Sequence, residues 1–156
     1  MRKIAAGLAL SLVLLTGCGE ETMNDAAGAL PTVTSNQGEA PTIGAPSGAA
    51  PTELVISDII VGTGAEALAT STMTVHYTLM TWSNGELIES SWNGGSPATF
   101  PLANVIVGWQ EGIPGMKVGG RRLLVIPPDL GYGAQGGGPI GPNETLIFVV
   151  DAIGVA

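Results

Sequence analysis

The 156-residue sequence is poor in the residue types that most catalytic chemistries use. Its single cysteine, Cys18, excludes an internal disulfide, and its position near the N-terminus excludes a metal site built on thiolates. The one histidine, His76, has no second histidine or cysteine to share a metal ion with, so we interpret it as structural or exposed. There is no Ser-His-Asp set, and the glycine run at residues 136–138 opens no helix that could bind phosphate. We therefore expect no metal ion and no cofactor.

Basic residues are also scarce. The chain has 13 acidic and 5 basic residues, and two of the basic ones, Arg2 and Lys3, lie in the N-terminal leader described below. The remaining chain has a net charge of about −10, which argues against nucleic acid and against electrostatic attraction to an anionic membrane. Any peptide partner is expected to be neutral or basic overall.

The N-terminus carries the pattern of a bacterial secretion signal. Arg2 and Lys3 precede an apolar run from residue 4 to residue 15, which is shorter than the roughly 20 residues that span a bilayer as a helix. The following Leu15-Thr16-Gly17-Cys18 resembles the lipobox of bacterial lipoproteins, in which the cysteine is lipidated and becomes the mature N-terminus. We predict a signal peptide over residues 1–17, a lipid on Cys18 and attachment to a membrane of the cell envelope, which is the outer membrane or periplasmic face in a Gram-negative source. The alternative is an ordinary signal peptide with a chance cysteine.

Residues 18–52 differ in composition from the rest of the chain. They are rich in Ala, Gly, Thr, Ser and Pro, and the prolines at 31, 41, 46 and 51 follow no helical or strand period. Such a segment buries too little apolar surface to offset its ordering entropy, so we predict a flexible tether over residues 18–52 and one folded domain over 53–156. A dimerising helical arm is the alternative; the prolines argue against it, and we expect a monomer.

The folded part shows several short strand patterns. Residues 73–81 alternate, with Met73, Val75, Tyr77 and Leu79 on one face, and Asn84-Gly85 is a typical hairpin turn. Expected strands cover residues 54–61, 73–81, 86–91, 98–102, 121–126 and 145–153. Since only one short helix accompanies them, without βαβ alternation, they predict an α+β domain with an antiparallel sheet.

One stretch, residues 105–113, predicts a short helix that begins near Trp109. A helix this short is marginal by itself, so we expect a sheet to wrap around it and to bury Val107, Trp109 and Ile113. A sheet curled over a short helix leaves a shallow apolar cup with the indole as its floor. Trp82 and Trp92 lie beside turns and are expected at an exposed rim.

The sequence of this domain resembles that of the FKBP-type peptidyl-prolyl isomerases in the order and spacing of many residues. The resemblance covers residues 54–153 and is carried by Val75-His76-Tyr77-Thr78, Gly85, Ser90-Ser91, Val105-Ile106-Val107-Gly108-Trp109, Gly112, Gly115-Met116, Val118-Gly119, Pro128, Tyr132-Gly133-Ala134, Pro142 and Thr145-Leu146-Ile147-Phe148. It implies a five- to six-stranded antiparallel sheet wrapped around one short helix, with a prolyl ring bound between them.

The resemblance also implies the roles of individual residues. The catalytic positions are Tyr77, Glu89, Ile106, Trp109, Tyr132 and Phe148, and the substrate-binding positions are Ile88, Val105 and Ile140. Trp109 corresponds to the floor beneath the proline, the N–H of Ile106 to the donor for a substrate carbonyl, and the Tyr132 hydroxyl to a group near the twisting amide.

Three positions depart from the family pattern. Ile88 and Ala98 stand where aromatic residues are common, and Glu89 replaces the aspartate that pairs with the tyrosine matching Tyr77. These departures predict a wider pocket and weaken the expectation of macrolide binding. We hypothesise a hydrogen bond between Tyr77 and Glu89.

The activity implied is isomerisation of Xaa-Pro bonds in exported, proline-containing polypeptides. Such a bond is a tertiary amide that interconverts in tens to hundreds of seconds, and a dry pocket shaped to the twisted amide accelerates it without a nucleophile. The alternative function is a peptide-binding or chaperone module with little catalytic activity. A passive envelope spacer is a third hypothesis, although a spacer has no need of the complete set of pocket residues.

Overall fold

A computed structural model describes residues 28–156 of the chain, so the predicted signal peptide and Cys18 lie outside the described residues. One antiparallel sheet contains the six strands β1 (Val55–Ile60), β2 (Thr72–Thr81), β3 (Leu87–Ser90), β4 (Ala98–Pro101), β5 (Arg121–Ile126) and β6 (Leu146–Val155). The α-helix α1 (Val107–Gly112) lies between β4 and β5 in the sequence. In the part of the chain that the structure describes, none of the helices has the length and hydrophobicity needed to span a bilayer.

The sheet has the strand order β1-β5-β6-β2-β3, and β4 pairs with the first half of β2. The two ten-residue strands β2 and β6 form its centre, which fits the apolar sequence of β6 and the alternation of β2. The predicted architecture, an antiparallel sheet with one short helix, is therefore confirmed.

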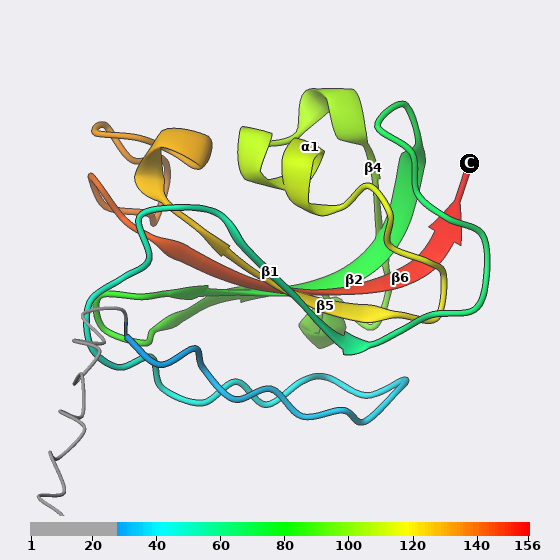
Figure 1. The fold of residues 1–156 in the computed structure, drawn as a ribbon, viewed down its shortest axis with the longest axis horizontal. Coiled ribbons are helices and arrows are strands. Elements are labelled where there is room, and N and C mark those ends of the chain that lie inside the picture. The colour runs from blue at the N-terminus through cyan, green and yellow to red at the C-terminus, as the bar shows by residue number, and fades with distance from the viewer. Residues whose placement is uncertain (1–27) are drawn as a thin grey trace, which may run out of the picture.

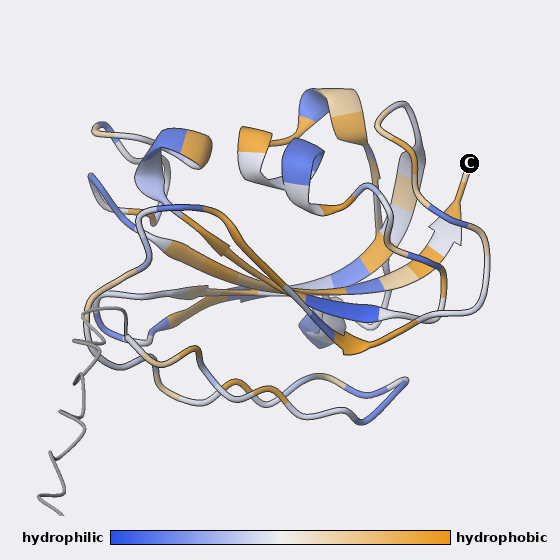
Figure 2. Cartoon of the chain, viewed as in Figure 1, coloured by the Kyte–Doolittle hydropathy of each residue, from blue (hydrophilic) through white to orange (hydrophobic). Residues whose placement is uncertain are grey.

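Each face of the sheet buries its own apolar cluster. The inner cluster contains Trp109 and Ile113 from the α1 region together with Val75, Leu79 and Phe148 of the sheet. The outer cluster is built around Trp82, Leu123 and Ile147, and residues of the N-terminal segment pack against it. Figure 1 shows α1 on one side of the sheet and this segment, in blue and cyan, on the other, and Figure 2 shows apolar positions along both.

The N-terminal segment, residues 28–52, differs from the flexible tether that its composition suggested. It folds back on itself, with Val33 bridged to Ile43, and both side chains pack on the outer cluster. We call residues 28–52 the strap. The expectation of a flexible tether is corrected for these residues. A few buried apolar side chains, and hydrogen bonds between side chains and backbone carbonyls that join the strap to the domain, offset the entropy lost on ordering.

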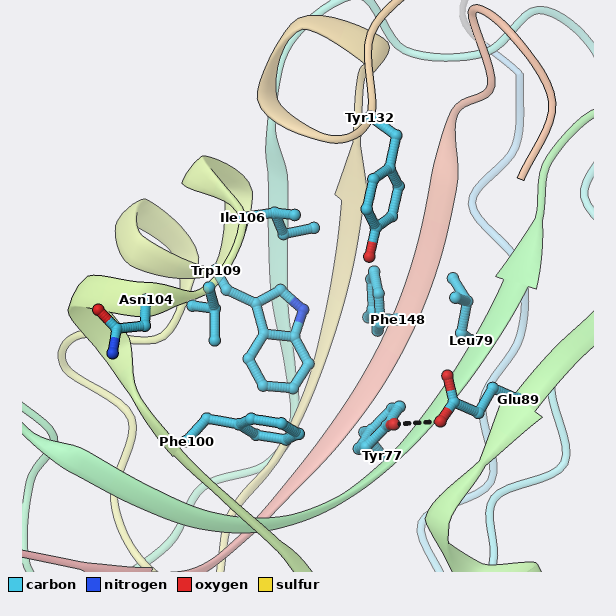
Figure 3. Close-up of a pocket in the computed structure, with 10 residues that line it drawn as sticks. Tyr77, Leu79, Glu89, Phe100, Asn104, Ile106, Trp109, Tyr132 and Phe148 are labelled. Atoms are coloured by element: carbon cyan, nitrogen blue, oxygen red, sulfur yellow. Dashed lines mark hydrogen bonds between the residues drawn. The ribbon is translucent and has the colours of Figure 1, made fainter. Parts of the chain in front are cut away.

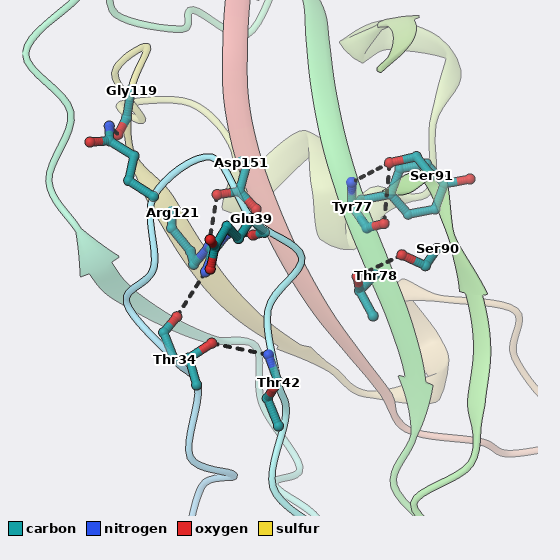
Figure 4. Close-up of polar contacts among 11 residues, drawn as sticks. Thr34, Glu39, Thr42, Tyr77, Thr78, Ser90, Ser91, Gly119, Arg121 and Asp151 are labelled. Atoms are coloured by element: carbon teal, nitrogen blue, oxygen red, sulfur yellow. Dashed lines mark hydrogen bonds and ion pairs between the residues drawn. The ribbon is translucent and has the colours of Figure 1, made fainter. Parts of the chain in front are cut away.

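A fully buried arginine on β5 holds the strap (Figure 4). The Arg121 guanidinium donates to the carbonyl oxygens of Thr34 and Glu39 at 2.8 and 2.6 Å and forms an ion pair with Asp151 at 2.8 Å. Burial raises the pKa of the Asp151 carboxyl, and the Arg121 guanidinium opposes this rise. Gln37 adds a bond to the carbonyl of Gly119, in the connection that follows α1. The strap is thus part of the folded domain, which begins before the predicted boundary at residue 53.

Two glycines let α1 lie directly on β5. A β-carbon on Gly108 would come within 2.4 Å of an Ile126 methyl, and one on Gly112 within 2.7 Å of a Leu124 methyl. These glycines, one turn apart, therefore form the face of the helix that meets the sheet. The prediction that Val107 is buried is wrong, since this residue is 44% exposed, whereas Trp109 and Ile113 are buried as expected.

Two tryptophans expected at an exposed rim are in fact packed. Trp82 is buried under the strap, and its indole N–H donates to the carbonyl of Gly48 at 3.2 Å. Trp92 stacks on the His76 ring with the centroids 3.9 Å apart. The position of these tryptophans beside turns did not predict their exposure. The strap packs on Trp82, and Trp92 lies in the 3₁₀ turn η1 (Ser91–Gly94), and neither contact is visible in the strand pattern.

The packing of the strap predicts that it contributes to the stability of the whole domain. Replacing Ile43 with aspartate places a charge against the outer cluster, so we expect Ile43→Asp to lower the free energy of unfolding by about 2–3 kcal/mol in urea denaturation. Thr42→Asp, at the exposed neighbouring position, is the control and should change it by less than about 0.5 kcal/mol. Equal stability of Ile43→Asp and the parent would show that the strap contributes nothing.

Candidate functional site

The inner face of the sheet and α1 enclose a pocket of about 380 Å³. Its walls come from β2, β3, β4, β6, the start of α1 and the loop after β5, so that residues far apart in sequence meet (Figure 3). The lining residues are Tyr77, Leu79, Glu89, Phe100, Asn104, Val105, Ile106, Trp109, Tyr132 and Phe148. Most of these side chains are apolar or aromatic, which is the usual lining of a small-ligand site.

The indole of Trp109 forms the buried end of the pocket. It is 4% exposed, and the rings of Tyr77, Phe100 and Phe148 meet it edge-on at centroid distances of 5.8, 5.9 and 5.3 Å. Edge-to-face contacts of this kind fix ring orientation as well as burying area. The buried Nε1 of Trp109 has no hydrogen-bond partner among the described residues, so the pocket contains an unused donor.

The entry to α1 presents backbone groups to the pocket. The Ile106 carbonyl accepts from the N–H groups of Trp109 and Gln110, and the Gln110 side chain donates to the Val105 carbonyl at 2.8 Å. The N–H of Ile106 donates to no group among the described residues. It is therefore available to a carbonyl oxygen bound in the pocket.

The other end of α1 is held by Arg122. Its guanidinium donates to the carbonyls of Gly112 and Pro114 at 2.9 and 3.3 Å, and it forms an ion pair with Asp58 on β1 at 2.6 Å. A cation at the C-terminal carbonyls of a helix satisfies acceptors that have no partner within the helix. This contact fixes the helix that carries Trp109.

One polar pair stands in the pocket wall. The hydroxyl of Tyr77 donates to Oε1 of Glu89 at 2.6 Å, so the hydrogen bond hypothesised from the sequence is present. Glu89 lies opposite Leu79 in the β2–β3 register, which places it diagonally across from Tyr77 on the same face. Burial raises the pKa of the Tyr77 hydroxyl, and the hydrogen bond to Glu89 and its charge raise it further.

The structure brings together seven of the nine site residues expected from the sequence. Tyr77, Glu89, Val105, Ile106, Trp109, Tyr132 and Phe148 all line the pocket. Ile88 and Ile140 do not: both pack in the inner cluster, Ile88 partly buried and Ile140 fully. Ile88 lies at the register shift of β3, between Glu89, which is opposite Leu79, and Leu87, which is opposite Met80.

Three lining residues were missed in the sequence. Leu79, Phe100 and Asn104 belong to the wall, and Phe100 supplies an aromatic ring two residues after Ala98, where the sequence lacks one. Ala98 and Phe100 are two residues apart on β4 and so face the same side of the sheet. This period of two was the signal that identifies Phe100.

The described residues do not form a metal site, and their one histidine lies outside the pocket. Residues 28–156 contain no group of three His, Cys, Asp or Glu side chains that could hold a metal ion. His76 is engaged with Trp92 and accepts or donates a hydrogen bond at Ser91, 3.0 Å away, outside the pocket. The site is an apolar pocket with a few hydrogen-bonding groups, suited to binding a ring and a carbonyl.

Comparison with known proteins agrees with this geometry. The sequence model of the family described as FKBP-type peptidyl-prolyl cis-trans isomerase matches residues 64–153. A probable FK506-binding protein of Corynebacterium glutamicum is 54% identical over 101 residues, which are 65% of this chain and 86% of that protein. An FK506-binding protein of Neisseria meningitidis is 47% identical over 106 residues, or 65% and 95% of the two chains. The crystal structure of AtFKBP13 is similar to this one with a TM-score of 0.61 and 38% sequence identity, over 69% of this chain and 96% of that one.

The described residues thus form an apolar, aromatic-lined pocket on an antiparallel sheet, and the chain belongs to the FKBP-type peptidyl-prolyl cis-trans isomerase family. It is an enzyme of that type, and proline-containing polypeptides are its substrates. The strap lies outside the residues that the family model matches.

The Tyr77–Glu89 pair predicts how one of the two tyrosines titrates. Because its pKa is raised in the folded state, Tyr77 contributes stability that is complete below about pH 10 and is lost as the pH rises through the raised pKa. In an absorbance titration of tyrosinate, we expect Tyr77→Phe to remove the component that ionises at the highest pH. Loss of the earlier component instead would contradict this assignment.

Proposed function

We propose that this isomerase acts on exported polypeptides while attached to a membrane of the cell envelope by a lipid on Cys18, as a monomer. The leader, the lipobox-like tetrad and the position of Cys18 support this context. The observation that carries the catalytic part is the pocket, in which three rings orient the Trp109 indole beside free backbone and hydroxyl groups.

We place the substrate proline ring against Trp109, between Tyr77, Phe100 and Phe148. The Ile106 N–H then donates to a substrate carbonyl, and the Tyr132 hydroxyl, on a side chain 42% exposed at the pocket mouth, lies near the amide. The barrier to rotation arises from amide resonance, which is lost when the bond twists. Apolar walls exclude water and disfavour the charge-separated planar form, so that the twisted amide is bound more tightly than the ground state.

No proton transfer enters this mechanism. The only carboxylate of the pocket, Glu89, accepts from Tyr77 and serves to orient that ring. Catalysis then depends on shape and on solvent exclusion, and the variants that reduce it are those that open the pocket.

Replacing Trp109 with leucine removes the ring that the other three orient. We expect Trp109→Leu to lower kcat/KM for a short Xaa-Pro peptide by about 10- to 100-fold, equivalent to about 1.4–2.8 kcal/mol of transition-state binding. The matched control is Trp92→Phe, which changes a tryptophan outside the pocket and should retain activity. If a folded Trp109→Leu variant, checked by urea denaturation, keeps the parent's rate, the placement of the proline is wrong.

The membrane attachment is tested by Cys18→Ser in the full-length chain. The variant has no thiol to acylate, so we expect it to move from the membrane fraction to the soluble fraction and to lose incorporation of a labelled fatty acid. The isomerase activity of the extract should persist, because the pocket lies in another part of the chain. Unchanged incorporation of the labelled fatty acid into Cys18→Ser would exclude Cys18 as the site of lipidation.

A further inference from the structure

The charges around the pocket are unbalanced. Among the ten lining residues, Glu89 is the only one that carries a charge, and no lysine or arginine lines the pocket with it. Its Oε1 accepts from Tyr77, whereas Oε2 has no hydrogen-bond partner among the described residues. Figure 3 shows this second oxygen directed away from Tyr77. The pocket wall therefore presents one fixed carboxylate with a free oxygen.

None of the three cations of the described residues lines the pocket. Arg121 is buried on the outer face with Asp151, and Arg122 is paired with Asp58 and the end of α1. Lys117, the third, lies in the connection after α1, in a backbone bridge with Glu66. None of the three forms an ion pair with Glu89, and the remaining charges of the described residues are predominantly acidic.

From this arrangement we infer that Glu89 makes the isomerase selective for proline flanked by a lysine or arginine, and against proline flanked by an acidic residue. The inference rests on the proposed placement of the proline beside Trp109. A residue next to that proline must leave the pocket through its mouth, where the exposed Glu89 carboxylate stands. A cationic side chain there gains an ion pair, and an acidic one meets repulsion with no cation to relieve it.

The fixed position of the Glu89 carboxylate increases the preference for a flanking lysine or arginine. The 2.6 Å bond from Tyr77 holds Glu89 in one orientation before substrate arrives, so a flanking lysine need not order both partners of the pair. An exposed ion pair of this kind changes an equilibrium constant by roughly two- to five-fold, so a lysine substrate should exceed a glutamate substrate by about 5- to 10-fold.

The experiment compares peptides that differ only beside the proline. Two series carry lysine, glutamine or glutamate, one series before the proline and one after it, and NMR exchange measures kcat/KM without a coupling protease. We expect lysine over glutamine over glutamate in at least one series at 20 mM salt, with the ratio of lysine to glutamate approaching about 2 at 0.5 M salt. Equal kcat/KM for the lysine and glutamate peptides in both series overturns the inference.

Two variants assign the selectivity to Glu89. Glu89→Gln keeps an oxygen for Tyr77 but removes the charge, so the ratio of lysine to glutamate should fall to about 2 or less, whatever its absolute rate. Glu66→Gln removes the same charge from an exposed position that does not line the pocket, and should leave the ratio unchanged. If both variants lower the ratio equally, the selectivity comes from the net charge of the domain and the assignment to Glu89 is wrong.

Titration of the same peptides by chemical shift separates this inference from the proposed placement. If the Trp109→Leu variant keeps full activity while lysine peptides still bind better than glutamate peptides through Glu89, the placement of the proline fails and the selectivity stands. If Trp109→Leu loses activity as expected but lysine and glutamate peptides bind the parent equally, the placement stands and the selectivity fails.

Discussion

The contact between α1 and β5 is the constraint on which the rest of the structure depends. A helix of six residues has too few internal hydrogen bonds to persist in water, so its position must come from packing. Gly108 and Gly112 bring its backbone onto Ile126 and Leu124, and Arg122 binds the carbonyls at its end. Trp109 projects from this fixed helix, and the pocket exists because three rings of the sheet converge on it.

Two adjacent arginines let β5 organise both faces of the sheet. Side chains alternate along a strand, so Arg122 reaches the helix on the inner face while Arg121 reaches the strap on the outer face. Both are buried and both are paired with an aspartate of a neighbouring strand, Asp58 or Asp151. Removing either would leave a buried carboxylate or helix end without its partner, which is more costly than the net worth of the pair.

The folded domain begins within the strap, before the residues that the family model matches. The family model matches residues 64–153, yet the outer cluster around Trp82 is completed by Val33 and Ile43 from well before that range. A chain cut at the boundary suggested by composition would expose this cluster and release two of the groups that Arg121 binds. The strap lies on the face of the sheet opposite α1 and the pocket.

Strand alternation and turn residues located the strands and the short helix, and the resemblance carried by motif spacing indicated the family and seven of the ten residues that line the pocket. Both signals are local properties of the chain and can be read without the fold. The tertiary structure alone decided the order of the strap, the burial of Trp82, the exposure of Val107 and the place of Phe100 in the wall. Each of these depends on which distant surface a side chain meets. Composition predicted a tether for residues 28–52 because it could not reveal that Arg121, more than 80 residues away, would bind its carbonyl groups.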